Sequence, residues 1–213
     1  MKHEVDGLEG LRKEAAGCRA CPLYRDATQT VFGEGPGDAR LVFVGEQPGD
    51  QEDVEGRPFI GPAGRLLAEA FEEAGIRRED VYVTNAVKHF KFVQRGKRRL
   101  HEKPSEAEVR ACRPWLEGEL RAIQPAVLVC LGATAAQSII GAHVRVLRDR
   151  GRVMASSFCE WTFVTVHPSA LLRMPDAKAR EAARAQFVGD LVSAAAFARG
   201  RGGREAVEGR SVA

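Results

Sequence analysis

The sequence predicts an α/β protein, a three-layer α/β/α sandwich built around a central, mainly parallel sheet of four strands. The first observation is a set of short, mostly apolar runs, at 41–44, 81–84, 126–131 and 162–166. Such runs are typical of strands that are buried on both faces. The second observation is that they alternate with segments of helical periodicity, the order in which a parallel sheet covered by helices is built.

Five helices are expected from periodicity and boundary residues: 8–16, 62–75, a stretch from Ser105 onward, 133–140 and 176–197. The segment 62–75 is the clearest, because its apolar residues recur on one face and Gly75 can end it. The stretch after Ser105 carries acidic residues in its first turn, which favours a helix start at this position.

The chain of 213 residues suits one compact domain, expected over 1–198, followed by a Gly- and Arg-rich, loosely ordered tail at 199–213. No apolar run approaches the roughly 20 residues that span a bilayer. The first residues, Met1 to Asp6, lack the apolar segment of a signal peptide. We therefore expect a cytoplasmic protein, and nothing in the sequence indicates more than a monomer.

Positive charge is concentrated in the segment 88–103, which holds seven Lys or Arg residues and one acid. The whole chain has a formal net charge of only +3, so the remainder is slightly negative. A local basic patch is typical of a surface that meets a polyanion. Neighbouring cations also favour the neutral, nucleophilic form of His101. The alternative is a solvated basic loop in which His101 only touches phosphate.

Three polar residues follow predicted strands. Glu46 comes after the first strand, Asn85 after the second and His167 after the fourth. In parallel sheets covered by helices, ligands bind beyond the carboxyl ends of the strands. We therefore expect these three side chains to converge on one site.

The cysteines form a third pattern. Cys18 and Cys21 have the spacing of a chelating pair, and Cys112 and Cys130 lie further along the chain. Four thiolates suit tetrahedral zinc or a four-iron cluster. The alternative is that Cys130 is a small core residue and Cys18 and Cys21 a simple thiol pair. Cys159, the fifth cysteine, is not part of this ligand pattern.

Four segments together carry a family resemblance: 45–49, 56–64, 84–88 and 167–169. They resemble the uracil-DNA glycosylase superfamily, and more narrowly its iron–sulfur branch, family 4, over roughly residues 10–198. Two departures, Gln47 and the inserted basic stretch 97–101, are similar to UdgX, a group that crosslinks itself covalently to uracil-containing DNA.

The resemblance implies a set of binding residues. It implies a structural [4Fe–4S] cluster held by Cys18, Cys21, Cys112 and Cys130. It also implies that Asn85 reads the edge of a flipped-out uracil and that Phe59 stacks on the base. His167 would donate to uracil O2. The further residues that it implies are Gly45 and Ser169 for the base, and Ser169, Arg173, Lys97, Arg98 and Arg99 for DNA phosphates.

The resemblance also implies the chemistry. His101 would attack C1′ of the deoxyribose and remain bonded to it, so that each molecule reacts once. Glu46 or Gln47 would orient the ring by accepting a hydrogen bond from Nδ1. The alternative is a conventional family 4 enzyme with many turnovers, in which His101 contacts phosphate. A third reading is a DNA-binding module without catalysis. The expected partner is uracil-containing DNA, single-stranded first and double-stranded left open, with free uracil as the product.

Overall fold

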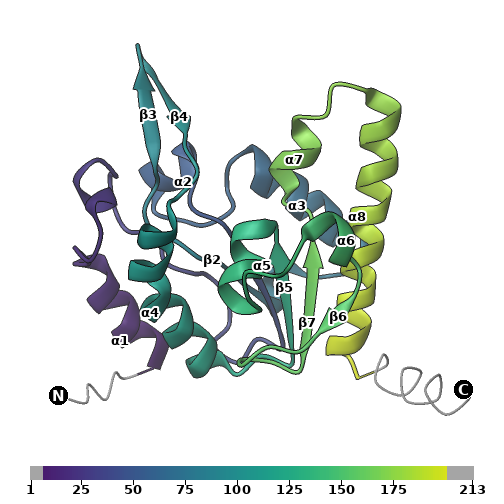
Figure 1. Ribbon diagram of the computed structural model, residues 1–213. Coiled ribbons are helices and arrows are strands. Elements are labelled where there is room, and N and C mark those ends of the chain that lie inside the picture. Colours follow the sequence, from purple (N-terminus) through teal and green to yellow (C-terminus); the bar gives the residue numbers. More distant parts are fainter. Residues whose placement is uncertain (1–6, 201–213) are drawn as a thin grey trace, which may run out of the picture.

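A computed structural model describes residues 7–200, so most of the expected tail lies outside the described residues. Its centre is a sheet in the strand order β2-β1-β5-β7-β6. The strands are β1 (Leu41–Gly45), β2 (Val81–Asn85), β5 (Val127–Leu131), β6 (Val153–Met154) and β7 (Trp161–Thr165). The first four in spatial order are parallel, and β6 pairs antiparallel with β7 at the edge. The predicted α/β class is confirmed (Figure 1).

The fifth strand is a difference from the four that the sequence predicts. β6 has only two residues, and it is partly exposed at the edge of the sheet. A two-residue strand is too short to show a periodic apolar pattern, so pairing with β7 defines it.

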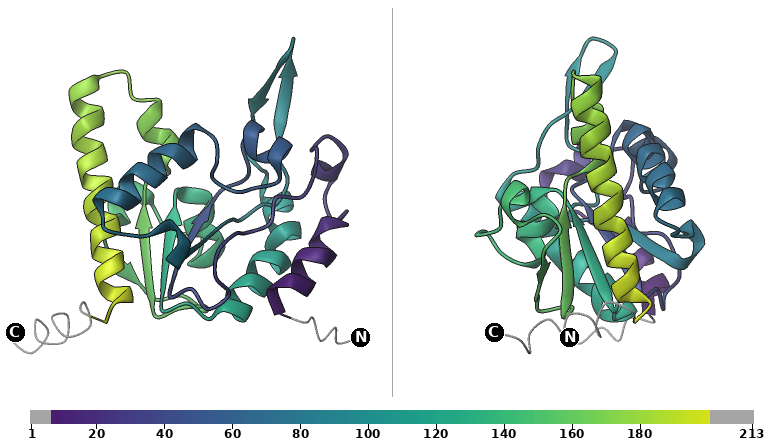
Figure 2. Two further views of the ribbon diagram at one scale, coloured as in Figure 1. Left: turned by 180° about the vertical axis from the view of Figure 1, so that it is seen from behind. Right: turned by 90° about the vertical axis from the view of Figure 1, so that its right-hand side faces the viewer.

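Helices cover both faces of the sheet, as the three-layer prediction requires. One face packs against α3 (Pro62–Glu73) and α8 (Ala177–Ala198). The other packs against α4 (Glu106–Ile123) and α5 (Ala133–Ile139), with α1 (Gly7–Ala16) lying on α4. Figure 2 shows α8 along one side of the sheet. Since both faces are covered, every residue of β1, β2 and β5 is buried, which explains the continuous apolar runs.

Local chemistry sets the helix starts that the sequence predicts. The Ser105 hydroxyl accepts a hydrogen bond from the Glu108 backbone N–H, and the Glu108 carboxylate accepts one from the Ser105 N–H. This capping box satisfies two donors that the first turn of α4 leaves free. The Asp176 carboxylate caps α8 in the same way through the Ala179 N–H, at 2.6 Å.

The basic stretch is a β-hairpin and not the loop that the sequence predicts. It consists of β3 (Phe92–Arg95) and β4 (Arg98–His101), with Phe92 paired to His101. Gly96 has φ +59° in the turn, a conformation that glycine adopts at little cost. The hairpin projects beyond the end of the sheet (Figure 1). His101 is therefore placed by strand pairing.

Five short helices complete the described chain: η1 (Pro22–Arg25), α2 (Asp50–Glu55), η2 (Arg78–Asp80), α6 (Val146–Asp149) and α7 (Pro168–Leu172). Between residues 7 and 200, no helix has the length and apolar character that crossing a membrane requires.

Candidate active site

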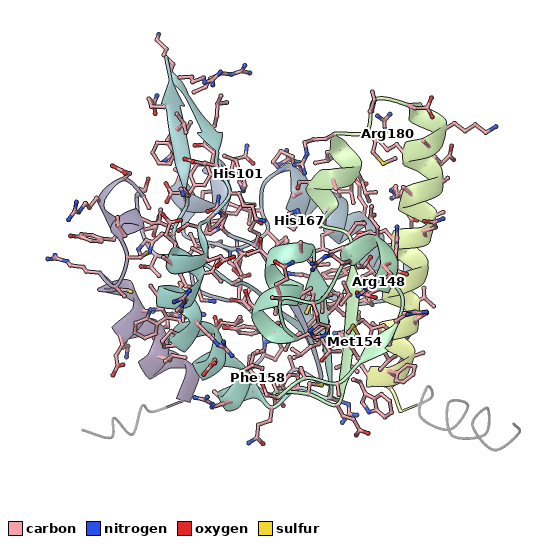
Figure 3. All side chains as sticks on the ribbon, in the orientation of Figure 1. His101, Arg148, Met154, Phe158, His167 and Arg180 are labelled. Carbon is pink, nitrogen blue, oxygen red and sulfur yellow. The ribbon has the colours of Figure 1, made fainter. Side chains whose placement is uncertain are left out.

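The carboxyl ends of the parallel strands bring the expected polar residues to one end of the sheet. Glu46 directly follows β1, Asn85 is the last residue of β2, and His167 lies between β7 and α7. The β3–β4 hairpin rises from this same end. Figure 3 shows His101 and His167 there, while Met154 and Phe158 lie toward the opposite end.

Gly45, Phe59 and Asn85 meet closely at this end. A Cβ added to Gly45 would lie 2.4 Å from Asn85 Oδ1 and 2.6 Å from Phe59 Cζ, so only glycine fits. Phe59 has φ +57°, which is costly for an aromatic residue and commonly marks a functional site. Gly64 permits this conformation, because a Cβ there would lie 1.9 Å from the Phe59 carbonyl oxygen.

Asn85 carries an unused polar atom. The residue is 3% exposed, and its Oδ1 has no hydrogen-bond partner. A buried acceptor without a donor costs about 1–3 kcal/mol, so such atoms commonly serve a ligand. A hydrogen bond fixes the Asn85 backbone: Lys88 Nζ donates to the Asn85 carbonyl oxygen at 2.8 Å.

His167 is held as a neutral donor. Its Nδ1 accepts a hydrogen bond from the Ser169 backbone N–H at 3.2 Å and lies 2.8 Å from Ser169 Oγ. Burial lowers the pKa of His167 to about 4. A neutral imidazole that accepts at Nδ1 carries its proton on Nε2, which is then free to donate. Arg173 Nη1 donates to Ser169 Oγ at 3.0 Å, so the two residues expected at a phosphate lie together.

Glu46 links the hairpin to the sheet. Its Oε1 lies 3.4 Å from His101 Nε2, and its Oε2 accepts a short hydrogen bond from Thr134 Oγ1. Burial raises the pKa of Glu46, but the hydrogen bonds from His101 and Thr134 outweigh it, so the pKa is lowered and the group is ionised. The charged side chain that contacts His101 is thus a carboxylate and not one of the cations that surround His101 in sequence.

The structure separates the roles of Glu46 and Gln47, which the sequence leaves open. Gln47 contacts backbone: its Nε2 donates to the carbonyls of Lys91 (3.1 Å) and Glu102 (3.0 Å), and its Oε1 accepts from the Lys91 N–H (3.0 Å). It therefore holds the two ends of the hairpin together at the base. Glu46 contacts the His101 ring, and it does so at Nε2 and not at the expected Nδ1.

The resemblance implies that Arg99 binds a DNA phosphate, but in the structure its side chain is engaged by acidic residues. Its guanidinium contacts Asp50 Oδ1 at 2.5 Å and Asp53 Oδ2 at 2.6 Å, and it lies over the rings of Phe90 and Phe92. The side chain therefore fastens the hairpin to α2. Lys97 and Arg98, at the exposed tip, keep the placement that phosphate binding needs.

Two other cations of the basic segment also face inward. Lys88 is fully buried, with Nζ 2.5 Å from Glu119 Oε2, and Lys91 Nζ lies 3.1 Å from Glu108 Oε2. Tyr82 donates to the same Glu119 carboxylate. The basic patch is thus smaller than the sequence count suggests.

Thr134 is a site residue that the sequence analysis did not select. It stands just after β5, at the N-terminus of α5, and so occupies a strand end like Glu46 and Asn85. That position is the signal that could have identified it. Glu119 gave no such signal, because a glutamate on a helix is ordinarily exposed.

The expected iron–sulfur ligands fit only in part. Cys21 and Cys112 pack in one buried cluster with Val87 and Leu23. Burial raises the pKa of Cys112 to about 12, and the thiols of Cys18 and Cys21 add to the rise. Trp115 packs against the same cluster and donates from Nε1 to Cys18 Sγ at 3.1 Å, so Cys18 borders the cluster as well. No group of three ligands close enough for a single ion occurs within 7–200, but a cluster holds its ligands farther apart.

Cys130 does not join this group. It lies on β5 with Val44 and Val164, in the core cluster beneath α4 and α5. Burial raises its pKa, and the thiol that adds to this rise is Cys159. The structure therefore brings three of the four expected ligands together and leaves the fourth in the apolar core.

The fold and the strand-end site define a class of protein. The sequence matches the uracil DNA glycosylase superfamily over residues 32–192, and the chain belongs to that superfamily. Among its relatives are enzymes named type-4 uracil-DNA glycosylase. The one from Thermotoga maritima is 41% identical over 167 residues, covering 78% of this chain and 83% of the relative. The one from Archaeoglobus fulgidus is 35% identical over 196 residues, covering 88% and 94%.

Proposed function

We propose that this protein excises uracil from DNA by breaking the bond between uracil N1 and deoxyribose C1′. The observation that carries the proposal is the buried, unpartnered Oδ1 of Asn85 beside the Phe59 ring. A glycosylase must take its base out of the stack and read its edge in a pocket. Uracil offers N3–H to Oδ1 and accepts at O4 from the amide NH₂, whereas cytosine presents the reverse pattern.

The neighbouring side chains supply the rest of the reaction. As the glycosidic bond breaks, its electron pair moves onto uracil, and negative charge grows at O2. The Nε2–H of His167 is a preset donor for that charge. The sugar is left with cationic character at C1′, which the ionised Glu46 carboxylate stabilises.

Substitution of Asn85 by alanine tests this proposal. It removes both edge contacts, worth about 1–3 kcal/mol, so kcat/KM for a uracil-containing oligonucleotide should fall roughly 5- to 150-fold. The measurement is strand scission at abasic sites after alkali treatment. Equal, salt-sensitive binding of uracil-containing and normal DNA by the wild-type chain, with no base released, would instead indicate a DNA-binding module without catalysis.

Two fates of the sugar remain to be distinguished. The similarity to type-4 enzymes supports attack by water, release of the abasic DNA and many turnovers. In that case His101 is a phosphate contact.

The contact between His101 and Glu46 supports covalent capture as the second candidate. Here Glu46 accepts the Nε2 proton from the imidazolium form of His101, and the lone pair left on Nε2 forms a bond to C1′ while Nδ1 keeps its own proton. The electron pair of the broken bond leaves with uracil, so one bond is exchanged for another. Glu46, the base at His101 Nε2, is protonated after this step and cannot activate water to displace the imidazole, so each molecule would react once.

A denaturing gel of the protein with a uracil-containing oligonucleotide separates these fates. A shifted band that survives heat and detergent supports capture, and the modified peptide should contain His101. His101→Ser should then abolish the band and admit water to C1′. Free abasic DNA with repeated turnover in the wild type, unchanged in His101→Ser, supports the conventional enzyme.

We also propose that the protein holds an iron–sulfur cluster with Cys18, Cys21 and Cys112 among its ligands. Cys21 and Cys112 share a buried, apolar cluster, and Cys18 contacts Trp115 at its border, which supports this. The cluster would tie the N-terminal segment to α4 and to the chain after β2, a structural role. We further propose that the chain acts as a monomer on uracil-containing DNA, with Lys97 and Arg98 at the phosphates.

A further inference from the structure

The fourth ligand of the proposed cluster has to come from a residue other than Cys130, if the arrangement around Cys18, Cys21 and Cys112 is kept. Cys130 is fully buried in the middle of the sheet. To reach the other sulfurs it would have to leave the core packing of β5. The candidates for the fourth ligand are therefore the residues around Cys112.

His89 directly follows the residue whose backbone contacts Cys112. The Lys88 backbone N–H donates to Cys112 Sγ at 3.1 Å, and His89 is the next residue along the chain. His89 is 4% exposed, whereas histidine is on average only intermediate in burial. Its Nδ1 has no hydrogen-bond partner, and it shares this state with Asn85 Oδ1 alone among buried side-chain atoms of residues 7–200.

The hydrogen bonds around His89 define which nitrogen carries the proton. Thr30 Oγ1 donates to the Ala15 carbonyl oxygen at 3.0 Å, which uses the single hydroxyl proton. The same oxygen lies 3.0 Å from His89 Nε2, so it must accept there, and Nε2 carries the ring proton. In a neutral imidazole, Nδ1 then has a free lone pair. Metal-binding histidines show this pattern: one nitrogen donates to an oxygen and the other binds the metal.

The same contacts connect His89 to the first cysteine pair. The Ala15 carbonyl oxygen, which accepts from Thr30, also accepts from the Cys18 backbone N–H at 3.0 Å. His89 is thus three hydrogen bonds from the backbone of Cys18 on one side and one peptide bond from the Cys112 contact on the other. Cys130 has no comparable connection among the described contacts.

We propose that His89 Nδ1, and not Cys130 Sγ, is the fourth ligand of the iron–sulfur cluster. The ligand set is then three thiolates and one neutral imidazole. This inference rests on the proposed cluster but not on the proposed excision of uracil.

The test measures iron and acid-labile sulfide per chain after anaerobic reconstitution, with the visible absorption of the cluster. Cys130→Ala should retain the wild-type iron content, as should Cys159→Ala, a matched removal of another buried thiol. His89→Ala should lose iron as Cys112→Ala does, and His89→Cys should recover it. Loss of iron in Cys130→Ala with full iron in His89→Ala would overturn the assignment. A wild-type chain that takes up no iron would refute the cluster itself.

A measurement on the wild type covers the case in which a variant does not fold. The chain is prepared with ¹⁵N-histidine, the cluster is reduced, and pulsed electron paramagnetic resonance records the nitrogen coupling. A directly bound imidazole should give a strong coupling that changes with the isotope and is absent from His89→Cys. Absence of histidine coupling in the reduced wild-type cluster would refute the proposal, whatever its activity on DNA.

Discussion

Glu46 Oε1 lies 3.4 Å from His101 Nε2, so the carboxylate after β1 meets the imidazole at the end of the β3–β4 hairpin. Three further contacts maintain this relationship. Thr134 holds the other carboxylate oxygen, Gln47 joins the base of the hairpin, and Arg99 fastens the hairpin to α2. The position of His101 therefore depends on the stretch 46–53 and on Thr134, both of which are distant from the hairpin in sequence.

Thr134→Val should change the pH dependence of excision. The hydroxyl donates to Glu46 and helps to lower its pKa against burial. Without this donor the pKa rises, so the carboxylate becomes protonated at a higher pH as the solution is acidified. In a plot of log kcat/KM against pH, the acid limb should therefore move to higher pH. Thr134→Ser, which keeps the hydroxyl, should leave the limb in place; an equal shift in both variants would contradict this role.

Gly45→Ala should impair excision without unfolding the protein. The added methyl group would displace Asn85 and Phe59 from their positions. A misplacement of about 1 Å at a reacting centre can reduce the rate roughly 100-fold. The matched control is Gly189→Ala at an exposed position of α8, where nothing lies within 4 Å of the added atom. It should be fully active and more stable by about 0.5–1 kcal/mol.

Arg98→Gln and Arg99→Gln should behave differently in salt. Arg98 is exposed at the tip of the hairpin, so its loss should reduce the slope of log affinity against log salt by about 0.9 for duplex DNA. Arg99 is engaged by Asp50 and Asp53, so its loss should leave the slope near the wild-type value while lowering the rate of the chemical step. Titrations at several salt concentrations measure both slopes. Equal slopes for the two variants would show that Arg99 leaves its acids to bind phosphate.

Lys88→Met should destabilise the fold severely. It leaves the Glu119 carboxylate, which is fully buried, without its cation. Breaking a buried ion pair in this way costs about 3–5 kcal/mol. Arg113→Gln, which breaks the exposed pair with Glu117, should cost only about 0.3–0.5 kcal/mol. Urea denaturation measures both values, and similar losses in the two variants would contradict the role assigned to burial.

The fold was largely predictable because its signals are local. Apolar runs, the Ser105 capping box and the helical periodicity of 62–75 each lie within one segment. β6 was missed because two residues show no period. The convergence of Glu46, Asn85 and His167 was also predictable, since topology alone places strand ends at one edge. Thr134 follows the same rule.

The pairing of charges was not predictable. The count of cations in 88–103 treats Lys88, Lys91 and Arg99 as surface charges, yet their acids come from α4 and α2. Likewise, Cys130 matches the expected ligand pattern in sequence but packs in the core. Opposite charges and ligands select partners by distance in space, which the order of residues does not contain.

The sequence by itself determined the class of fold, the edge of the sheet where the site lies and the superfamily to which the chain belongs. Only the tertiary structure decided that Glu46 and not Gln47 contacts His101, and that acids occupy Arg99. It also decided that the backbone just before His89 contacts Cys112, and that one buried nitrogen of His89 has no partner. The physical reason is that helices and strands form through contacts between near neighbours. A buried hydrogen bond or ion pair joins atoms that only the folded chain brings together.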